Sequence, residues 1–189
     1  MSAPRIRPAT RTDGPGILAI YNDAVRTTTA TYDETPRTPE QQEWWLEAHE
    51  RARLPVLVAE EAVSGGPPRI SGWSSLSRWQ DRAGYRFTAE TSIYVAAGDR
   101  GRGVGTLLMA PLIAAAAARG MHVLLALVDA ANEPSLRLHA RFGFVPSGHL
   151  REVGYKFGRW LDVILLERRI TGRDADQNFS GTPSSSTRS

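Results

Sequence analysis

A glycine-rich segment in the middle of the chain carries the clearest chemical pattern. Residues 100–105 read Arg-Gly-Arg-Gly-Val-Gly, between an alternating apolar run at 93–95 and apolar residues with helical spacing. A glycine-rich turn from a strand into a helix leaves backbone N–H groups unshielded at the helix N-terminus, where they favour a phosphate or pyrophosphate. Arg100 and Arg102 can add charge-assisted contacts. The segment therefore predicts a phosphate site, with an ordinary strand–helix turn as the alternative.

The elements around this turn predict one mixed α/β domain. Strands are expected near 6–9, 56–59, 70–76, 85–95 and 122–128, with another that begins at 143–145 and a last one near 163–166. Helices are expected near 12–25, 38–49, 104–119 and 132–142. Thr38 and Gln41 have the spacing of a helix capping box. Pro111 lies within the helix that follows the glycines and is expected to kink or break it. The element order predicts a mixed central sheet flanked by helices.

Length and composition limit the class of protein. The chain has 189 residues, of which 41% are hydrophobic, enough for one domain with a hydrophobic core. We assign residues 1–170 to this domain. The polar residues 171–189 cannot bury enough apolar surface to fold and are expected to form a disordered tail.

The same composition argues against several partners. No apolar run is long enough to span a bilayer, the N-terminus lacks the apolar core of a secretory signal, and there is no cysteine. These features fit a cytoplasmic protein and exclude disulfides and thiolate zinc sites. The net charge of +3 comes from scattered arginines without an aromatic–basic motif, and the histidines are isolated from acidic clusters. We expect no nucleic acid, no membrane and no metal.

Several segments resemble the GNAT family of acetyltransferases. Residues 100–105 resemble its acetyl-CoA pyrophosphate loop, (Q/R)-x-x-G-x-(G/A), and residues 132–144 resemble its second cofactor motif, an asparagine and a short helix ending in Gly-Phe. Residues 88–95 look like the T-x-E-x-S-x-Y-V segment of the phosphinothricin and methionine sulfoximine N-acetyltransferase branch, and 17–22 and 155–160 are also similar to it. The resemblance covers about residues 5–170. It implies a GNAT fold, in which the mixed sheet contains a splayed parallel pair of strands.

The resemblance also implies an activity. Members of this branch use acetyl-CoA as co-substrate and acetylate the α-amino group of phosphinothricin, methionine sulfoximine or methionine sulfone by direct transfer. Acetylation of another amine, such as a polyamine or a peptide N-terminus, is one alternative, and a non-catalytic acetyl-CoA sensor is another. Because the branch resembles dimers, we expect a homodimer.

Two residues are candidates for proton transfer. By strand alternation Glu90 shares a face with Ser92 and Tyr94, and it could act as the general base if apolar surroundings raise its pKa. The alternative is a surface glutamate in a strand. His139 stands where many family members carry a tyrosine that protonates the leaving thiolate. Imidazole suits that task near neutral pH, although a histidine on a short helix can equally be structural.

The resemblance assigns the binding residues position by position. The strand backbone at Ile93, Tyr94 and Val95 is implied to meet the acetyl carbonyl and the pantetheine arm. The pyrophosphate is implied to contact Arg100, Gly101, Arg102, Gly103, Val104 and Gly105. Asn132 is implied to bond the pantetheine, and its alternative role is a simple helix cap.

The substrate residues are less closely defined. Tyr32, Arg82 and Tyr85 are the candidates, because an arginine binds a carboxylate or phosphinate bidentately and the tyrosines could wall the pocket. Arg78 competes with Arg82 for this role. Lys156, Phe157 and Trp160 could close the pocket, from the same subunit or from a neighbouring one.

Overall fold

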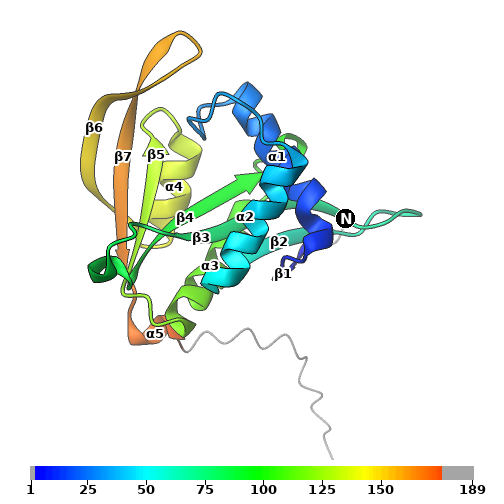
Figure 1. Ribbon diagram of the computed structural model, residues 1–189, viewed down its shortest axis with the longest axis horizontal. Helices are drawn as coiled ribbons and strands as arrows, with labels where there is room; N and C mark the ends of the chain where they lie inside the picture. Colours follow the sequence, from blue (N-terminus) through cyan, green and yellow to red (C-terminus); the bar gives the residue numbers. More distant parts are fainter. Residues whose placement is uncertain (1–2, 176–189) are drawn as a thin grey trace, which may run out of the picture.

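The computed structural model describes residues 3–175 as one seven-stranded sheet with helices on both faces (Figure 1). In chain order the elements are β1 (Arg5–Pro8), η1 (Arg11–Asp13), α1 (Gly14–Thr27), α2 (Pro39–Ala52), β2 (Val56–Glu61), β3 (Arg69–Arg78), η2 (Ala83–Tyr85), β4 (Thr88–Val95), η3 (Ala97–Asp99), α3 (Val104–Ala118), β5 (Val123–Asp129), α4 (Glu133–Arg141), β6 (Val145–Lys156), β7 (Arg159–Arg169) and α5 (Gly172–Ala175). The η elements are single 3-10 turns. The mixed α/β architecture expected from the sequence is confirmed.

The sheet has one parallel step in an otherwise antiparallel order. The strands follow the order β1-β2-β3-β4-β5-β7-β6, and only β4 and β5 run parallel. That pairing covers three residues of each strand, from Thr88 opposite Val123 to Glu90 opposite Leu125. Beyond this point the two strands part, so the expected splayed parallel pair is confirmed.

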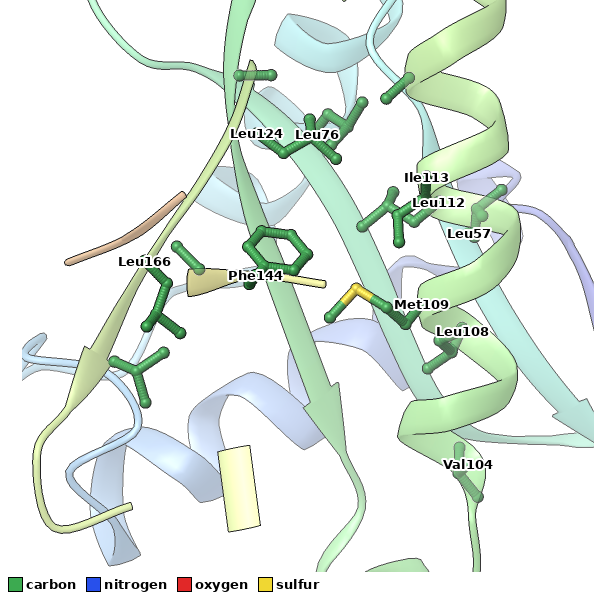
Figure 2. Close-up of a cluster of buried hydrophobic side chains, with 14 of the residues drawn as sticks. Leu57, Leu76, Val104, Leu108, Met109, Leu112, Ile113, Leu124, Phe144 and Leu166 are labelled. Carbon is green, nitrogen blue, oxygen red and sulfur yellow. The ribbon is translucent and has the colours of Figure 1, made fainter. Parts of the chain in front are cut away.

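The main hydrophobic core lies between α3 and the sheet (Figure 2). Val104, Leu108 and Leu112 recur every four residues along α3 and are buried. They meet strand residues that include Leu57, Leu76, Leu124 and Leu166, and the ring of Phe144. The helix continues through Pro111 from Val104 to Ala118, so the expected break does not occur. Strong packing along the whole helix outweighs the one backbone hydrogen bond that proline removes.

A second cluster covers the opposite face. Ile17, Tyr21 and Val25 of α1 pack against Val58 and Trp73 of β2 and β3. Trp73 in turn stacks on the ring of Tyr94 at 4.7 Å between centroids. The two clusters fix β4 in the middle of the sheet, with alternate side chains pointing to opposite layers.

Several boundaries differ from those expected. The strand expected over 85–95 begins at Thr88, because residues 83–85 form a 3-10 turn in which the N–H of Arg86 donates to Ala83. The last two strands form one long hairpin, whose turn has positive φ at Phe157 (51°) and Gly158 (75°). Positive φ at both central residues is typical of a type I′ hairpin turn.

The expected tail begins with a short ordered segment. Residues 172–175 form α5, where the carboxylate of Asp174 accepts hydrogen bonds from the backbone of Thr171 and from Arg168. The rest of the expected tail, 176–189, lies outside the described residues. Across residues 3–175 no helix is both long enough and apolar enough to cross a membrane.

Candidate active site

The parting of β4 and β5 exposes one backbone edge in the centre of the sheet. On its other side β4 stays paired with β3 as far as Val95, which lies opposite Gly72. At the fork the hydroxyl of Thr91 donates to the carbonyl of Leu125 at 3.1 Å. From there to Val95 the edge of β4 that faces away from β3 has no partner strand among the described residues. Its polar groups are therefore available to an extended ligand.

The glycine-rich turn lies directly after this open edge. Gly101 and Gly103 have φ of 77° and 84°, a left-handed conformation that strains other residues. Gly103 precedes the first residue of α3 and has no capping side chain, so the first N–H groups of the helix lack intrahelical partners. Gly105 serves packing instead, because a Cβ there would lie 3.1 Å from Leu138 of α4. The turn can therefore hold an anion with backbone donors.

The two arginines of the turn already have protein partners. The guanidinium of Arg102 pairs with Asp99 at 2.5 Å and with Glu61 at 3.1 Å, and Arg69 pairs with the same two carboxylates. Asp99 and Glu61 are 2% and 5% exposed. Arg100 bends back, with its Nε donating to the carbonyl of Val95 at 3.3 Å. Phosphate contacts by Arg100 and Arg102 stay predictions, while the ionic cluster of Arg69, Arg102, Glu61 and Asp99 is a feature of the fold.

Glu90 lies at the fork itself. It is the last residue of β4 that pairs with β5, and it is partly buried on the face shared with Ser92 and Tyr94. Burial raises the pKa of its carboxyl, and no hydrogen bond or ion pair of its side chain is found within residues 3–175. A carboxyl group in this condition has the electrostatic property that a general base near neutral pH requires.

The side chains of Ile93, Tyr94 and Val95 alternate between the two faces of the sheet. Ile93 and Val95 pack against the core under α3, so only their backbone groups can meet a ligand at the open edge. Tyr94 points to the other face, where its hydroxyl donates to the carbonyl of Ala30 at 3.3 Å. Burial raises the pKa of Tyr94, so its phenol is neutral and ties the strand to the loop after α1.

Asn132 and His139 lie at the two ends of α4. The Oδ1 atom of Asn132 accepts a hydrogen bond from the N–H of Ser135 at 3.2 Å, so it caps the helix. The Nδ1 of His139 is 2.8 Å from the carbonyl of Ser135 and must carry the proton of that bond. Burial lowers the pKa of His139. A neutral imidazole with a bare Nε2 is a poor acid, so proton donation by His139 stays a prediction.

The candidate substrate residues fall into two groups. Tyr32 lies in the α1–α2 loop, where its hydroxyl donates to the carbonyl of Asp162 at 3.2 Å. A cavity of about 630 Å³ beside it is lined by Tyr32, Asp33, Glu34, Thr35 and Tyr155. Arg82 and Tyr85 are exposed in the connection that precedes β4. Within residues 3–175 no hydrogen bond or ion pair joins them to Tyr32, and the part of all three in substrate binding stays a prediction.

Other contacts of the α1–α2 loop were not expected from the sequence. Lys156 is 2% exposed, and its Nζ donates to the carbonyl of Thr31 at 2.7 Å. Thr29 donates to the carboxylate of Asp129 at the end of β5. The loop is therefore held to β4, β5, β6 and β7 and spans the open end of the fork. Phe157 and Trp160 are exposed at the hairpin tip, and their part in closing a pocket of the same or a neighbouring subunit stays a prediction.

No group of three or more histidine or acidic side chains suited to a metal ion occurs in the part of the chain that the structure describes. A cavity of about 760 Å³ beside α1 is lined by small and apolar residues together with paired charges that include Arg7, Asp13 and Glu60. The open backbone edge of β4 therefore runs from a carboxyl of raised pKa, Glu90 at the fork, to the backbone anion site that follows Val95 and η3.

Known proteins share both this sequence and this architecture. The model of the acetyltransferase (GNAT) family matches residues 17–144. An L-methionine sulfoximine/L-methionine sulfone acetyltransferase of Pseudomonas paraeruginosa is 43% identical over 165 residues, which are 87% of this chain and 94% of that protein. A phosphinothricin N-acetyltransferase of Streptomyces coelicolor is 42% identical over 167 residues, 88% and 96% of the two chains. The crystal structure of a phosphinothricin acetyltransferase from Sinorhizobium meliloti in complex with AcCoA has a TM-score of 0.84 and 30% identity, and the match covers 89% of each chain.

Proposed function

Because the chain belongs to the GNAT family of acetyltransferases, we propose that it transfers the acetyl group of acetyl-CoA to the α-amino group of a small amino-acid-like substrate. The substrate class is that of its relatives: phosphinothricin, methionine sulfoximine or methionine sulfone. The observation that carries the proposal is the position of Glu90 at the fork of β4 and β5, on the strand whose open edge leads to the glycine-rich turn. The substrate amine and the acetyl donor would meet there.

The residues present suit acetyl-CoA as co-substrate. The left-handed glycines at 101 and 103 and the uncapped start of α3 suit a pyrophosphate, and the open edge of β4 from Ile93 to Val95 suits the amide-containing pantetheine arm. When bound, the co-substrate supplies an acetyl thioester. N–H groups on the open edge of β4 would stabilise the thioester oxygen as it gains negative charge.

The chain's own chemical contribution is proton transfer. An α-ammonium group cannot attack a thioester until it loses a proton, and the Glu90 carboxylate would accept that proton directly or through a water. A raised pKa makes Glu90 a stronger base than an exposed glutamate. His139 would protonate the leaving thiolate only if substrate binding raises the pKa of the imidazole.

The decisive experiment measures thiol release from acetyl-CoA in the presence of phosphinothricin, methionine sulfoximine, methionine sulfone, ordinary amino acids and polyamines. Glu90→Gln should lower kcat/KM by about 100-fold or more and leave acetyl-CoA affinity unchanged in calorimetry. Glu43→Gln, the same change on the exposed face of α2, is the matched control. Unchanged turnover in Glu90→Gln would remove Glu90 as the base. Acetyl-CoA binding with no acetylated amine would instead favour a sensor.

We further propose that the protein is a cytoplasmic homodimer. The absence of cysteine suits a reducing compartment. The distal part of the β6–β7 hairpin exposes the large apolar side chains of Val153, Tyr155, Phe157 and Trp160, and such a patch is typical of a protein interface. Light scattering of the wild type and of Trp160→Glu tests the dimer. A monomeric wild type would overturn it.

A further inference from the structure

The glycine-rich turn leaves most of its own backbone donors unused. The N–H groups of Gly101 and of residues 103–105 have no hydrogen-bond acceptor within residues 3–175. Between residues 99 and 103 the described backbone makes one hydrogen bond, from the N–H of Arg102 to the carbonyl of Asp99, and it is long at 3.4 Å. A segment with so few bonds of its own loses conformational entropy when it keeps one shape. Side chains must therefore hold this turn.

Arg69 makes the best-formed of the side-chain contacts to the turn. It is the first residue of β3, and its guanidinium binds both carboxylate oxygens of Asp99, with Nη1 2.5 Å from Oδ2 and Nη2 2.8 Å from Oδ1. Two parallel hydrogen bonds fix the orientation of a carboxylate as well as its position. Nη2 also donates to Glu61, which lies directly opposite Arg69 in the ladder of β2 and β3. The sheet therefore grips the chain two residues before Gly101.

Arg69 also balances charge beside the candidate anion site. The carboxylates of Asp99 and Glu61 are buried, and Arg69 and Arg102 both bind each of them. The hydrogen bond from Arg69 is the largest cause that lowers the pKa of Asp99. Without Arg69 two buried carboxylates would share one arginine, which is unfavourable in itself and repels an anion nearby.

We propose that Arg69 is a positioning residue for acetyl-CoA: its two-bond contact with Asp99 holds the glycine-rich turn in the conformation whose backbone N–H groups receive the pyrophosphate. This inference rests on the proposed use of acetyl-CoA and deepens it. A turn that already has its binding conformation has less freedom to lose when the ligand binds, so its affinity is higher. Arg69 acts through Asp99 and needs no contact with the phosphates.

The other contacts of this segment do not replace Arg69. Arg100 reaches the carbonyl of Val95 at 3.3 Å and lies 3.7 Å from a carboxylate oxygen of Asp23, and both distances are longer than those from Arg69 to Asp99. The N–H of Ala96 donates to the carbonyl of Ser71 at 2.9 Å, which fixes the chain before η3 and leaves the glycines free. Asp99 is therefore the point at which the turn is tied to the sheet.

The chain offers a matched control in Arg7. Its guanidinium binds Asp13 of a 3-10 turn at 2.7 Å and Glu60 of β2 at 2.6 Å, which repeats the arrangement of Arg69 with Asp99 and Glu61. None of the hydrogen bonds found for Arg7 within residues 3–175 reaches the glycine-rich turn. Arg7→Met should therefore lower stability as Arg69→Met does, but leave acetyl-CoA binding unchanged.

The first test measures acetyl-CoA affinity by calorimetry in the absence of an amine. Arg69→Met should weaken binding by about tenfold or more, the factor that one charge-assisted hydrogen bond carries. The KM for acetyl-CoA should rise by a similar factor, while the KM for the amine and kcat at saturating acetyl-CoA stay near those of the wild type. In the Asp99→Asn background Arg69→Met should have little further effect, because its action passes through Asp99. Equal losses of affinity in Arg7→Met and Arg69→Met would overturn the proposal.

The second test needs no ligand. Nitrogen-15 relaxation should give the N–H groups of Gly101 and Gly103 order parameters of about 0.85 in the wild type and below about 0.6 in Arg69→Met. A wild type that binds no acetyl-CoA would refute the proposed function, yet these order parameters would still decide whether Arg69 holds the turn. Arg69→Lys keeps the charge but not the two parallel bonds, and it decides the matter if Arg69→Met fails to fold. Wild-type affinity and order parameters in Arg69→Lys would overturn the positioning role.

Discussion

The contact between Gly154 and Tyr32 predicts a large effect from the addition of one methyl group. A Cβ at Gly154 would lie 2.3 Å from Cε2 and 2.5 Å from Cδ2 of the Tyr32 ring, far inside van der Waals contact. The φ of Gly154 is not positive, so alanine is excluded only by the ring. Gly154→Ala must therefore displace Tyr32 and break its 3.2 Å hydrogen bond to the carbonyl of Asp162.

The expected cost has two parts. Overpacking of a close contact costs about 1–3 kcal/mol, and a lost hydrogen bond costs about 1 kcal/mol. We therefore expect Gly154→Ala to lower the free energy of unfolding by about 2–4 kcal/mol, a large share of the 5–15 kcal/mol typical of a domain. Because the displaced ring belongs to the α1–α2 loop, the KM for the amine should rise more than kcat falls.

Urea unfolding followed by tryptophan fluorescence measures the first effect, and steady-state kinetics measures the second. Gly148→Ala is the matched control on the same strand, because its Cβ would lie at an ordinary 3.7 Å from Leu165. In Tyr32→Ala/Gly154→Ala the new methyl group has room, so the double variant should lose less stability than the sum of the single changes. Full additivity, or a Gly154→Ala protein as stable as the wild type, would refute the reasoning.

Three further predictions concern the turn and the buried charges. Asp99→Asn should lower the free energy of unfolding by about 1–2 kcal/mol. The loss is no larger because solvent screens the ion pairs that Asp99 makes with the half-exposed Arg69 and Arg102. Because Arg69 lowers the pKa of Asp99 in the folded state, the stability it contributes is present at neutral pH and lost as pH falls below the ordinary aspartate value of about 3.9. Acid unfolding of the variant should lack this component, and identical acid curves would contradict it. Gly103→Ala should weaken acetyl-CoA binding, because alanine in the left-handed conformation is strained by about 1 kcal/mol or more. Gly98→Ala is the control and should not weaken binding, because Gly98 has no positive φ and no neighbour near the position of a Cβ. Equal acetyl-CoA affinities of the two variants in calorimetry would rule this out. Burial lowers the pKa of Lys156 in the folded state, so below about pH 10 the unfolded chain binds more protons and the stability of the wild type should rise with pH. Lys156→Met should remove this rise. Parallel curves of stability against pH for the two proteins would count against this.

Local patterns were sufficient for most of the fold. Each residue of the predicted capping box bonds the backbone of the other, with the N–H of Gln41 donating to Thr38 and the N–H of Thr38 donating to Gln41. The glycines of the turn have the left-handed φ values that a close backbone approach requires. The sequence predicts the start of the β6 strand near Val145 but not its length, because Pro146, Gly148 and Gly154 interrupt the pattern and the register shifts twice. An edge strand tolerates such interruptions.

The candidate site was only partly predictable, because its decisive contacts join distant residues. Spacing along β4 placed Glu90 on the face of Ser92 and Tyr94, but Arg69 and Asp99 are 30 residues apart and meet only because β3 pairs with β4 in the sheet. The sequence predicts Arg102 as a phosphate ligand, yet its guanidinium forms an ion pair with Glu61 of β2. A local pattern fixes the type and position of a side chain, and the tertiary fold decides its partner.

The α1–α2 loop also sets an order of events in time. Its anchors join Thr29 to Asp129, Thr31 to Lys156 and Tyr32 to Asp162, separations of 100, 125 and 130 residues. Contacts of such long range form late, because the intervening chain must first be ordered. During synthesis the loop emerges early, but its bonds to Lys156 and Asp162 cannot form until the β6–β7 hairpin is made. We therefore expect the α1–α2 loop to be the last part of the domain to become ordered, and catalytic activity to appear later than the hydrophobic core.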